Sequence, residues 1–415
     1  MKRLFILILF YWILLIENGT NLIGVILELG DGLEVRLSLI IKILFFVVSA
    51  FSVFVLRKKM WGVNPLILFM VFLIFSTFYS SIINSKHFIS AFVFDFHIQL
   101  VLIIVIYIQL SDIKLSDIEK FVQWLRVFGF INALLVIISY LFPSLLSSFQ
   151  SGTSDVGITR AFGIMGDEVS LLLTFFFFDA LVFRKRLLVL FYSVSIVLTG
   201  GIGAFITLIS LLLYYLFYIQ QNTRKNVLKK INLSIISFVL ILFLFDYLEE
   251  ISLIKRIYSN FDDSGNGTGS LRLFSLSIAL DMIKSSPMLG TGFGAYSFVV
   301  NDVFQYDTFE VSMNIVRSSF NPYVQMICEA GFIGLLVFIY FLISSLKIIR
   351  VNSYGDYFLD NFRVVSYGWL LVFFLTCMTA NWFLPSSFLF ILVVTLIGLS
   401  LKINQIYFER EPIYK

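Results

Sequence analysis

Four charged residues, Arg160, Arg272, Arg317 and Glu329, are notable because they lie at or beside apolar segments of the sequence. A charge at the centre of a membrane-spanning helix costs about 2.5 to 3.5 kcal/mol on the insertion scale, so each of these residues needs an explanation. Glu329 fits either a catalytic carboxylate or a buried ion pair with an arginine. The arginines fit a functional site, with a snorkelling Arg160 and a solvated Arg272 as the simpler alternatives.

The segment SSPMLGTGFGAY, residues 285–296, contains Gly290, Gly292 and Gly294 and looks like a phosphate-binding loop. A dinucleotide fingerprint needs a strand before its glycines and a third glycine three residues beyond the second. Here the third glycine comes after two residues, and the helix-like stretch LRLFSLSIALDMIKSS precedes the glycines. The spacing therefore argues against a nucleotide site and predicts tight turns whose backbone lies close to a partner.

Other polar groups give weaker patterns. Asp95, His97 and Gln99 interrupt an apolar segment, as in a proton-coupled transporter, but His97 does not share a helical face with the other two. The segment DDSGNGTGS resembles a calcium loop, although its twelfth position is Leu273 instead of glutamate. No histidine or cysteine cluster in the sequence has the spacing of a zinc site. We therefore expect no metal and no cofactor.

The composition is that of a membrane protein. Hydrophobic residues make up 59% of the chain and charged residues 13%, whereas about a quarter of the residues of a soluble domain are charged. A helix needs about 20 apolar residues to cross about 30 Å of hydrocarbon. Twelve apolar segments approach that length, at 4–24, 37–56, 65–84, 88–110, 121–142, 162–183, 187–199, 201–220, 231–248, 318–346, 364–383 and 385–401.

Basic residues set the predicted orientation. Clusters such as Arg57-Lys58-Lys59 and Arg184-Lys185-Arg186 fall in the even-numbered connections, which places these connections and both termini in the cytoplasm. The N-terminus resembles a signal peptide but has no small-x-small cleavage site, so we expect it to be retained as the first span. Residues 143–161 and 249–317 then form long outer connections, where function is expected.

The predicted fold is all-α, with about 12 transmembrane helices and a large extracytoplasmic loop that contains an amphipathic helix. We expect spans one to nine in residues 1–248, the loop in 249–317, and spans ten to twelve with a cytoplasmic tail in 318–415. The loop helix is predicted from apolar residues at helical spacing, namely Leu273, Leu276, Leu280 and Ile283. Pro287 ends this helix, and Asn321 followed by Pro322 is typical of a helix start.

Four blocks of the sequence, taken in order, resemble the O-antigen polymerase and O-antigen ligase family. They read TRAFGIMGDEVSLL, VLTGGIGAFITLISLLL, GSLRLFSLSIALDMIKSSPMLGTGFGAYSF and FNPYVQMICEAGFIGLLVFI, within roughly residues 158–346. Arg160 and Arg272 match the family's arginines, residues 287–292 match its Pro-x-x-Gly-x-Gly element, and Glu329 begins its Glu-x-Gly. The predicted twelve spans, with a large loop before the tenth, agree with this resemblance.

The resemblance implies a multi-pass enzyme of the bacterial cytoplasmic (inner) membrane that transfers glycan from undecaprenyl diphosphate. Its arginines would bind the diphosphate through charge-assisted hydrogen bonds. The catalytic residues it implies are Arg160, Arg272 and Glu329. The substrate-binding residues are Arg317, Asn321, Asp167, Gly290, Gly292 and Gly294. The partners are an undecaprenyl diphosphate-linked oligosaccharide and membrane lipids, with a chain-length regulator protein as a further candidate and no nucleic acid.

Two departures from the family pattern bear on the reaction. Phe320 stands where a histidine activates the acceptor in the ligase branch, and Gly201-Ile202-Gly203 replaces a Ser-Arg-Gly. The lost histidine favours a polymerase of O-antigen or capsule repeat units. It leaves the general base open among Asp167, Glu168, Glu310 and Glu329. The alternatives are an O-antigen ligase and, from another class, a flippase for lipid-linked sugars.

Overall fold

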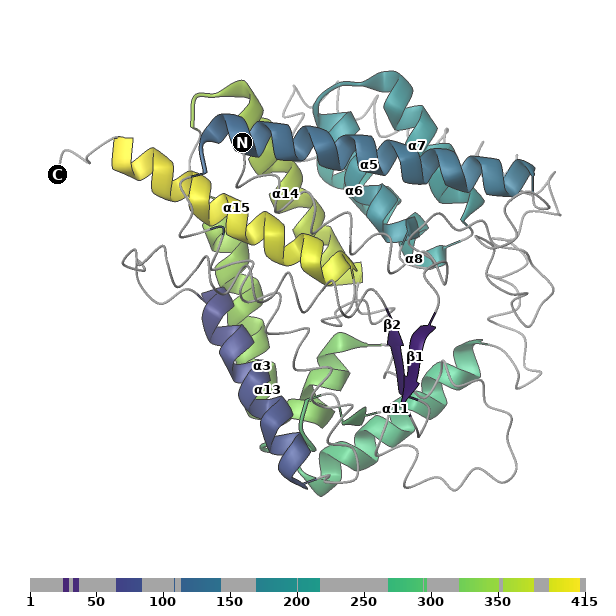
Figure 1. The fold of residues 1–415 in the computed structure, drawn as a ribbon, viewed down its shortest axis with the longest axis vertical. Coiled ribbons are helices and arrows are strands. Elements are labelled where there is room, and N and C mark those ends of the chain that lie inside the picture. Colours follow the sequence, from purple (N-terminus) through teal and green to yellow (C-terminus); the bar gives the residue numbers. More distant parts are fainter. Residues whose placement is uncertain are drawn as a thin grey trace. The chain divides into compact units, whose positions relative to one another are not determined.

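The computed structural model describes the helices and the hairpin that Figure 1 draws as ribbons. The described residues are 25–29, 33–36, 65–83, 108, 113–142, 169–199, 201–216, 268–293, 295–296, 321–350, 354–376 and 388–410.

The chain separates into two compact units, each assembled from segments far apart in the sequence. The first unit combines Met1–Trp124, Ser270–Asp356 and Cys377–Lys415. The second combines Leu125–Gly269 and Tyr357–Thr376. The predicted division into residues 1–248, 249–317 and 318–415 stays a prediction. It assigns segments to the membrane or to one side of it, whereas the two units are defined by contacts within the chain.

The second unit is a bundle of apolar helices. Its members are α5 (Leu115–Leu141), which belongs to this unit from Leu125 onward, α6 (Val169–Val182), α7 (Arg186–Leu198), α8 (Ile202–Tyr214) and α14 (Tyr357–Thr376). Almost every residue of α6 is buried, so this helix is the centre of the unit. A helix that is hydrophobic all round is expected at such a position.

Aromatic side chains fill the space between α6 and α14. Trp369 is fully buried and lies edge-on to Phe175, with 5.3 Å between the ring centroids. Its Nε1 donates a hydrogen bond to Thr174 Oγ1 at 3.1 Å, which satisfies the only polar group of the indole. On the α5 side, a Cβ atom at Gly129 would overlap the ring of Phe176. The glycine therefore allows α5 to pack closely on α6.

Contacts within this unit fix the directions of its helices. Phe130 stacks on Phe191 with ring centroids 5.0 Å apart, and Ser195 Oγ donates to the Ala133 carbonyl at 3.3 Å, so α5 and α7 run parallel. The beginning of α5 meets the end of α6, so these two helices run in opposite directions. This alternation is the one that successive membrane crossings require.

A partly buried ion pair joins α5 to α6. Arg126 Nε donates to Asp179 Oδ2 at 2.7 Å, and Arg126 Nη2 donates to Asp179 Oδ1 at 2.8 Å. The guanidinium also lies 4.1 Å from the ring centroid of Phe183. Paired hydrogen bonds and contact with an aromatic ring stabilise an arginine side chain that is largely shielded from water.

The first unit contains α3 (Pro65–Ile83), α11 (Thr268–Ser285), α13 (Pro322–Ile349), α15 (Phe388–Arg410) and a short hairpin. Phe69 near the start of α3 stacks on Phe341 near the end of α13, with 4.5 Å between the centroids, so these helices are antiparallel. The C-terminal ends of α13 and α15 meet where the Asn404 side chain donates to the Ile348 carbonyl at 3.0 Å. Tyr354 donates its hydroxyl to the same asparagine.

The hairpin departs from the predicted all-α fold. Strands β1 (Val25–Leu29) and β2 (Leu33–Arg36) pair antiparallel, with Leu29 opposite Leu33. The sequence between them is Gly-Asp-Gly, and an Asp-Gly pair between apolar stretches favours a hairpin. The two strands, of five and four residues, are far shorter than the roughly 20 apolar residues of a membrane span. Apart from these strands, the described elements are helices, as predicted.

Four of the described helices are long and apolar enough to cross a membrane: Leu115–Leu141, Pro322–Ile349, Tyr357–Thr376 and Leu389–Tyr407. Shorter apolar helices occupy Leu66–Tyr79, Val169–Val182, Arg186–Leu198 and Gly203–Tyr214. All of these coincide with predicted spans, which supports a multi-pass membrane protein. The predicted spans at 4–24, 37–56 and 231–248, and nearly all of 88–110, lie outside the described residues, so the count of twelve stays a prediction.

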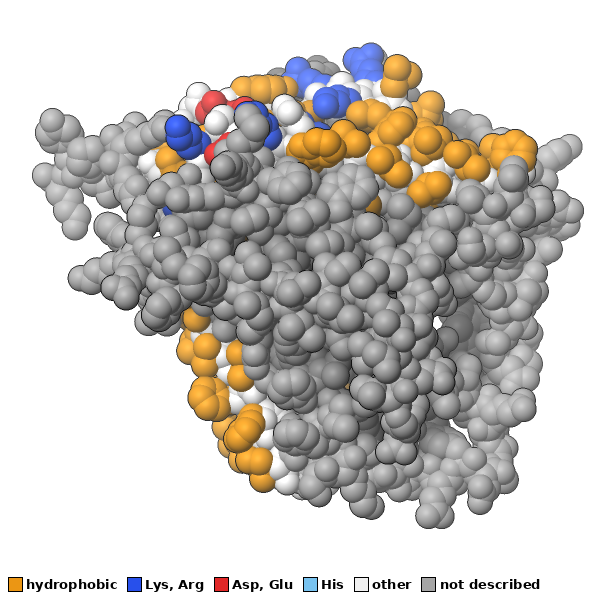
Figure 2. Space-filling model, viewed as in Figure 1, with side chains coloured by type: hydrophobic (Ala, Val, Ile, Leu, Met, Phe, Trp, Pro, Cys, Tyr) orange, Lys and Arg blue, Asp and Glu red, His pale blue; other side chains and the backbone are white. Residues whose placement is uncertain are grey.

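Figure 2 shows exposed hydrophobic side chains over the described helices, with Lys and Arg side chains beside them at the upper edge of the view. The exposed apolar residues on α7 are Leu187, Leu190 and Val194. They follow helical spacing along one face, while Tyr192 and Ile196 on the same helix are buried. An apolar face turned outward is what contact with lipid requires.

Candidate functional site

The predicted tenth span is broken at Gly331. This residue has φ 66° and ψ −170°, which is not helical, inside the helix α13. A short helical segment therefore precedes the break and a longer one, residues 332–349, follows it. At about 1.5 Å per residue the longer segment rises roughly 27 Å, close to the roughly 30 Å of a hydrocarbon core. Glu329 thus stands at the break, before the segment that is long enough to span.

The segment 287–292, here called the glycine clasp, supplies the hydrogen bonds that α13 loses at this break. In a regular helix the carbonyls of residues 328 and 329 would accept from the amides of residues 332 and 333. Instead, the Cys328 carbonyl accepts from the Thr291 amide at 3.1 Å, and the Glu329 carbonyl accepts from the Gly292 amide at 2.6 Å. The amide of Phe332 donates to the Pro287 carbonyl at 2.9 Å. The clasp and the break therefore depend on each other.

Two glycines allow the backbones to come this close. Gly290 has φ +70°, and a Cβ atom there would overlap the backbone between Glu329 and Ala330. Gly331 has φ +66°, and a Cβ atom there would overlap the Met288 carbonyl. L-residues with a side chain avoid positive φ, and neither position has space for a side chain. This confirms the predicted close approach of the backbone and names its partner, which is the broken helix.

Glu329 is held at the break by the segment that follows the clasp. Its side chain is buried, with the residue 1% exposed, and Oε1 accepts a hydrogen bond from the Tyr296 amide at 3.0 Å. A buried carboxylate is costly unless it is hydrogen-bonded, and this amide donor also fixes its orientation. The segment that follows the glycine clasp therefore positions the Glu329 carboxylate, which lies 33 residues further along the chain.

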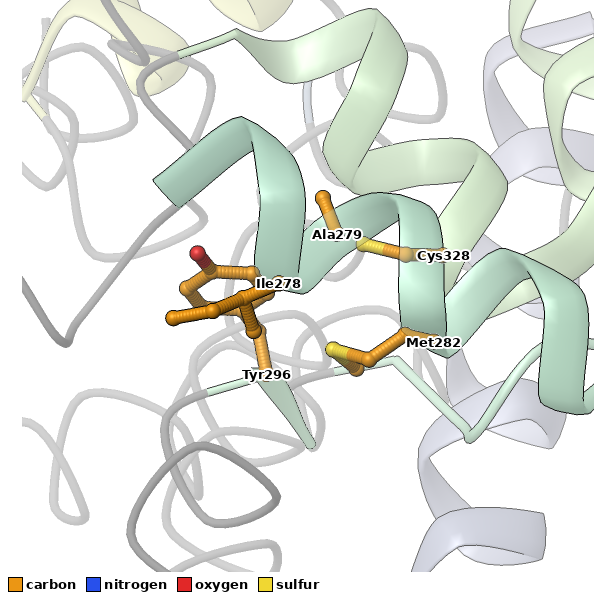
Figure 3. Close-up of a cluster of buried hydrophobic side chains, with 5 residues drawn as sticks. All are labelled: Ile278, Ala279, Met282, Tyr296 and Cys328. Carbon is orange, nitrogen blue, oxygen red and sulfur yellow. The ribbon is translucent and has the colours of Figure 1, made fainter. Parts of the chain in front are cut away.

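Helix α11 packs on the same region through a small buried cluster. Figure 3 shows Ile278, Ala279 and Met282 of α11 together with Tyr296 and Cys328. The hydroxyl of Tyr296 lies 2.7 Å from Ser275 Oγ and donates to the Ser275 carbonyl at 3.1 Å. Tyr296 therefore contacts both α11 and Glu329.

The predicted amphipathic helix is present as α11, and it ends at Ser285, just before Pro287. Of the predicted apolar face, Leu276 and Leu280 are 38% and 48% exposed, whereas Ile283 packs against the cluster of Figure 3. The helix therefore has two apolar faces, one packed on the protein and one turned outward. The outward face is the one expected to lie on the membrane surface.

Asn321 caps α13. Its Oδ1 accepts hydrogen bonds from the amides of Tyr323 at 2.9 Å and Val324 at 3.2 Å, and Pro322 follows it in the first turn. Such a cap stabilises a helix by about 1 kcal/mol. The predicted helix start is thus confirmed, and the cap gives Asn321 a structural role whatever else it binds.

The comparison with protein families bears on this region. Residues 187–339 match a family model described as O-antigen ligase. This part of the chain is O-antigen ligase-like. The resemblance predicted from the sequence blocks is thereby confirmed over α7, α8, α11, the glycine clasp and the beginning of α13. No curated protein matches the chain.

The structure brings together some of the predicted site residues of the O-antigen ligase-like region. Gly290 and Gly292 contact the backbone of Glu329, and Asn321 lies two helical turns before it on α13. Arg272 lies on α11, where its backbone is described but its side chain is not. The residues outside the described part of the chain are Arg160, Asp167, Glu168, Gly294, Glu310, Arg317 and Phe320, along with Asp95, His97 and Gln99.

The amides of residues 290–293 and of Ala295 donate hydrogen bonds within the protein. The amides of residues 290, 291 and 292 donate to carbonyls, the Phe293 amide donates to Ser76 Oγ at 3.0 Å, and the Ala295 amide donates to the Gly292 carbonyl at 3.1 Å. A phosphate-binding loop needs such amides directed at the ligand. This arrangement agrees with the spacing argument against a nucleotide loop.

Tyr296 and Ser275 were not singled out in the sequence. Both are buried, and a tyrosine or serine inside an apolar segment carries no spacing signature of its own. Among the described residues, no group of three or more His, Cys, Asp or Glu side chains is arranged to hold a metal ion. The expectation that the reaction needs no metal stays a prediction.

Proposed function

We propose that the chain is a polysaccharide polymerase that joins lipid-linked repeat units at the outer face of the bacterial cytoplasmic membrane. The glycan on one undecaprenyl diphosphate carrier is the donor, and a sugar hydroxyl of a second lipid-linked unit is the acceptor. The hydroxyl oxygen bonds to the anomeric carbon while the bond to the diphosphate oxygen breaks. The products are a longer lipid-linked glycan and free undecaprenyl diphosphate.

The observation that carries this proposal is the match of residues 187–339 to the O-antigen ligase model. The matched region includes the glycine clasp, the break in α13 and Glu329, so the family's motifs coincide with one folded arrangement. The family accounts for membrane glycosyltransferase chemistry and for a lipid-linked oligosaccharide as substrate. It gives no support to the flippase alternative.

Within the family, the choice of polymerase over ligase rests on position 320. The ligase branch places there a histidine that activates the acceptor hydroxyl, and this chain has Phe320. A phenyl ring cannot accept a proton, so another group must serve as the base. An enzyme that transfers finished chains by the ligase route would lack the base it normally uses.

We infer that Glu329 is the carboxylate that accepts the hydroxyl proton. It is buried, and the Tyr296 amide orients it from one side at 3.0 Å. A carboxylate oriented in this way can accept a proton from a hydroxyl group. Asp167, Glu168 and Glu310 are the other candidates for this role.

Arg160 and Arg272 are proposed to bind the leaving diphosphate, with Arg317 as a third arginine. Guanidinium groups form paired hydrogen bonds with phosphate oxygens and stabilise the charge that develops as the glycosidic bond breaks. The position of Arg272 on α11, which packs on Tyr296 and Cys328, is consistent with a role beside Glu329. Asn321, Asp167 and the three glycines would complete the binding surface.

Deletion of the gene distinguishes the polymerase from the ligase. Loss of a polymerase should leave surface glycan one repeat unit long, because single units are still transferred. Loss of a ligase should instead leave long chains on the carrier lipid and none on the final acceptor. Accumulation of long carrier-linked chains would therefore contradict the polymerase and support the ligase.

A further inference from the structure

Tyr296 connects the two parts of the proposed site. It is 1% exposed, its amide donates to Glu329 Oε1 at 3.0 Å, and its hydroxyl lies at the other end of the ring against Ser275. One residue therefore contacts both the carboxylate at the break and a helix that comes before it in the sequence. The tyrosine ring sets the distance between these two contacts.

The helix at the hydroxyl end is the one that carries Arg272. Ser275 lies three residues after Arg272 on α11, and positions three apart lie on neighbouring parts of one helix face. The Tyr296 hydroxyl is bound there twice, to Ser275 Oγ at 2.7 Å and to the Ser275 carbonyl at 3.1 Å. A rotation or slide of α11 would break both contacts.

The apolar contacts of α11 carry no directional requirement of the kind that a hydrogen bond has. Ile278, Ala279 and Met282 pack on the Tyr296 ring and Cys328, and apolar packing is not directional. A slip of one residue along a helix moves every side chain by about 1.5 Å and rotates it by about 100°. Hydrogen bonds at Ser275 have a required distance and angle, so they resist such a slip.

We propose that Tyr296 and Ser275 are positioning residues that hold α11, and with it Arg272, in register with the Glu329 carboxylate. This inference rests on the proposed function of the same site. Neither residue touches the substrate in this account. Their effect is on the geometry between the group that binds the diphosphate and the group that takes the proton.

The test is steady-state kinetics of lipid-linked repeat-unit extension by the purified full-length protein and three variants, Tyr296→Phe, Ser275→Ala and the double variant. Tyr296→Phe keeps the ring and the amide that binds Glu329, and it removes the hydroxyl that contacts Ser275. We expect kcat per folded molecule to fall roughly 10- to 100-fold, as small misplacements of reacting groups do. KM should change little, and the double variant should be no worse than the single ones.

Tyr192→Phe is the matched control, because it removes the hydroxyl of another buried tyrosine in the second unit. It should leave kcat unchanged. Wild-type kcat in Tyr296→Phe and Ser275→Ala would overturn the inference. A loss of folded protein with unchanged kcat per folded molecule would also overturn it, because it would assign the pair a purely structural role.

Failure of the inference can be separated from failure of the proposed function with Glu329→Gln and Arg272→Ala. If both of these abolish extension while Tyr296→Phe is normal, the site stands and only the positioning role is wrong. If Glu329→Gln extends glycan at the wild-type rate, the assignment of the base fails first. The positioning role then fails with it.

Discussion

At the scale of single residues, the glycines of the clasp serve as packing positions for a broken helix. Gly290 and Gly331 face each other's backbone segments, and both have positive φ. The sequence predicted turns close to a partner, but the partner was unknown because spacing alone does not say which carbonyls the amides will meet. The partner is the backbone around Glu329, forty residues further along the chain.

Gly290→Ala should destabilise the protein more than Gly355→Ala. Both glycines have φ +70°, but a Cβ at Gly355 meets nothing within 4 Å, whereas one at Gly290 overlaps the Glu329 backbone. The left-handed backbone alone costs about 1 to 2 kcal/mol for a residue with a side chain, and Gly290→Ala adds the overlap. Thermal unfolding in detergent measures the difference. Equal midpoints for the two variants would show that the clasp is not closely packed in solution.

At the scale of elements, the sequence predicted helices well and their interruptions poorly. The apolar segments at 65–84, 187–199 and 318–346 correspond to α3, α7 and α13 within a few residues. The break at Gly331 was not predicted, because glycine is common in membrane helices and its φ depends on the segment that packs beside it. The hairpin at residues 25–36 was missed because it is shorter than the segments sought.

The sequence singled out several residues of the candidate site, but it did not predict which of them contact one another. Glu329, Gly290 and Gly292 were singled out, and the structure brings them together. The hydrogen bond between Tyr296 and Ser275 was not predicted, because these two residues form no recognisable sequence pattern. Side-chain pairs between distant segments depend on tertiary packing, which one sequence does not reveal.

The Arg126–Asp179 pair gives a test of how α5 and α6 are held together. Asp179→Asn should destabilise the protein by less than the roughly 3 to 5 kcal/mol of a fully buried pair, because the Arg126 side chain that loses its carboxylate is 18% exposed. The double variant Arg126→Met with Asp179→Leu should recover most of this loss, since an apolar pair has no buried charge. Thermal unfolding in detergent measures the stability of the wild type, of Asp179→Asn and of the double variant. A double variant as unstable as Asp179→Asn would contradict this role.

At the scale of the whole molecule, each of the two compact units is built from packed apolar helices. In the first unit α3 and α13 lie antiparallel, and in the second unit α5 and α6 do, with Arg126 and Asp179 paired between them. The glycine clasp belongs to the first unit and is near the ends of α3 and α13 that were predicted to face outward. This placement agrees with a lipid-linked substrate that is presented at the membrane surface.

The central claim is that this protein extends lipid-linked glycans, and it is tested most directly by the purified protein in lipid nanodiscs. The substrate is a defined repeat unit on undecaprenyl diphosphate, and the products are separated by glycan length. The account predicts a ladder of lengthening glycans with release of one undecaprenyl diphosphate per new linkage, and no ladder with Arg272→Ala or Glu329→Gln. Transfer of a preformed chain to a lipid A-core acceptor without any lengthening of the carrier-linked unit would contradict it.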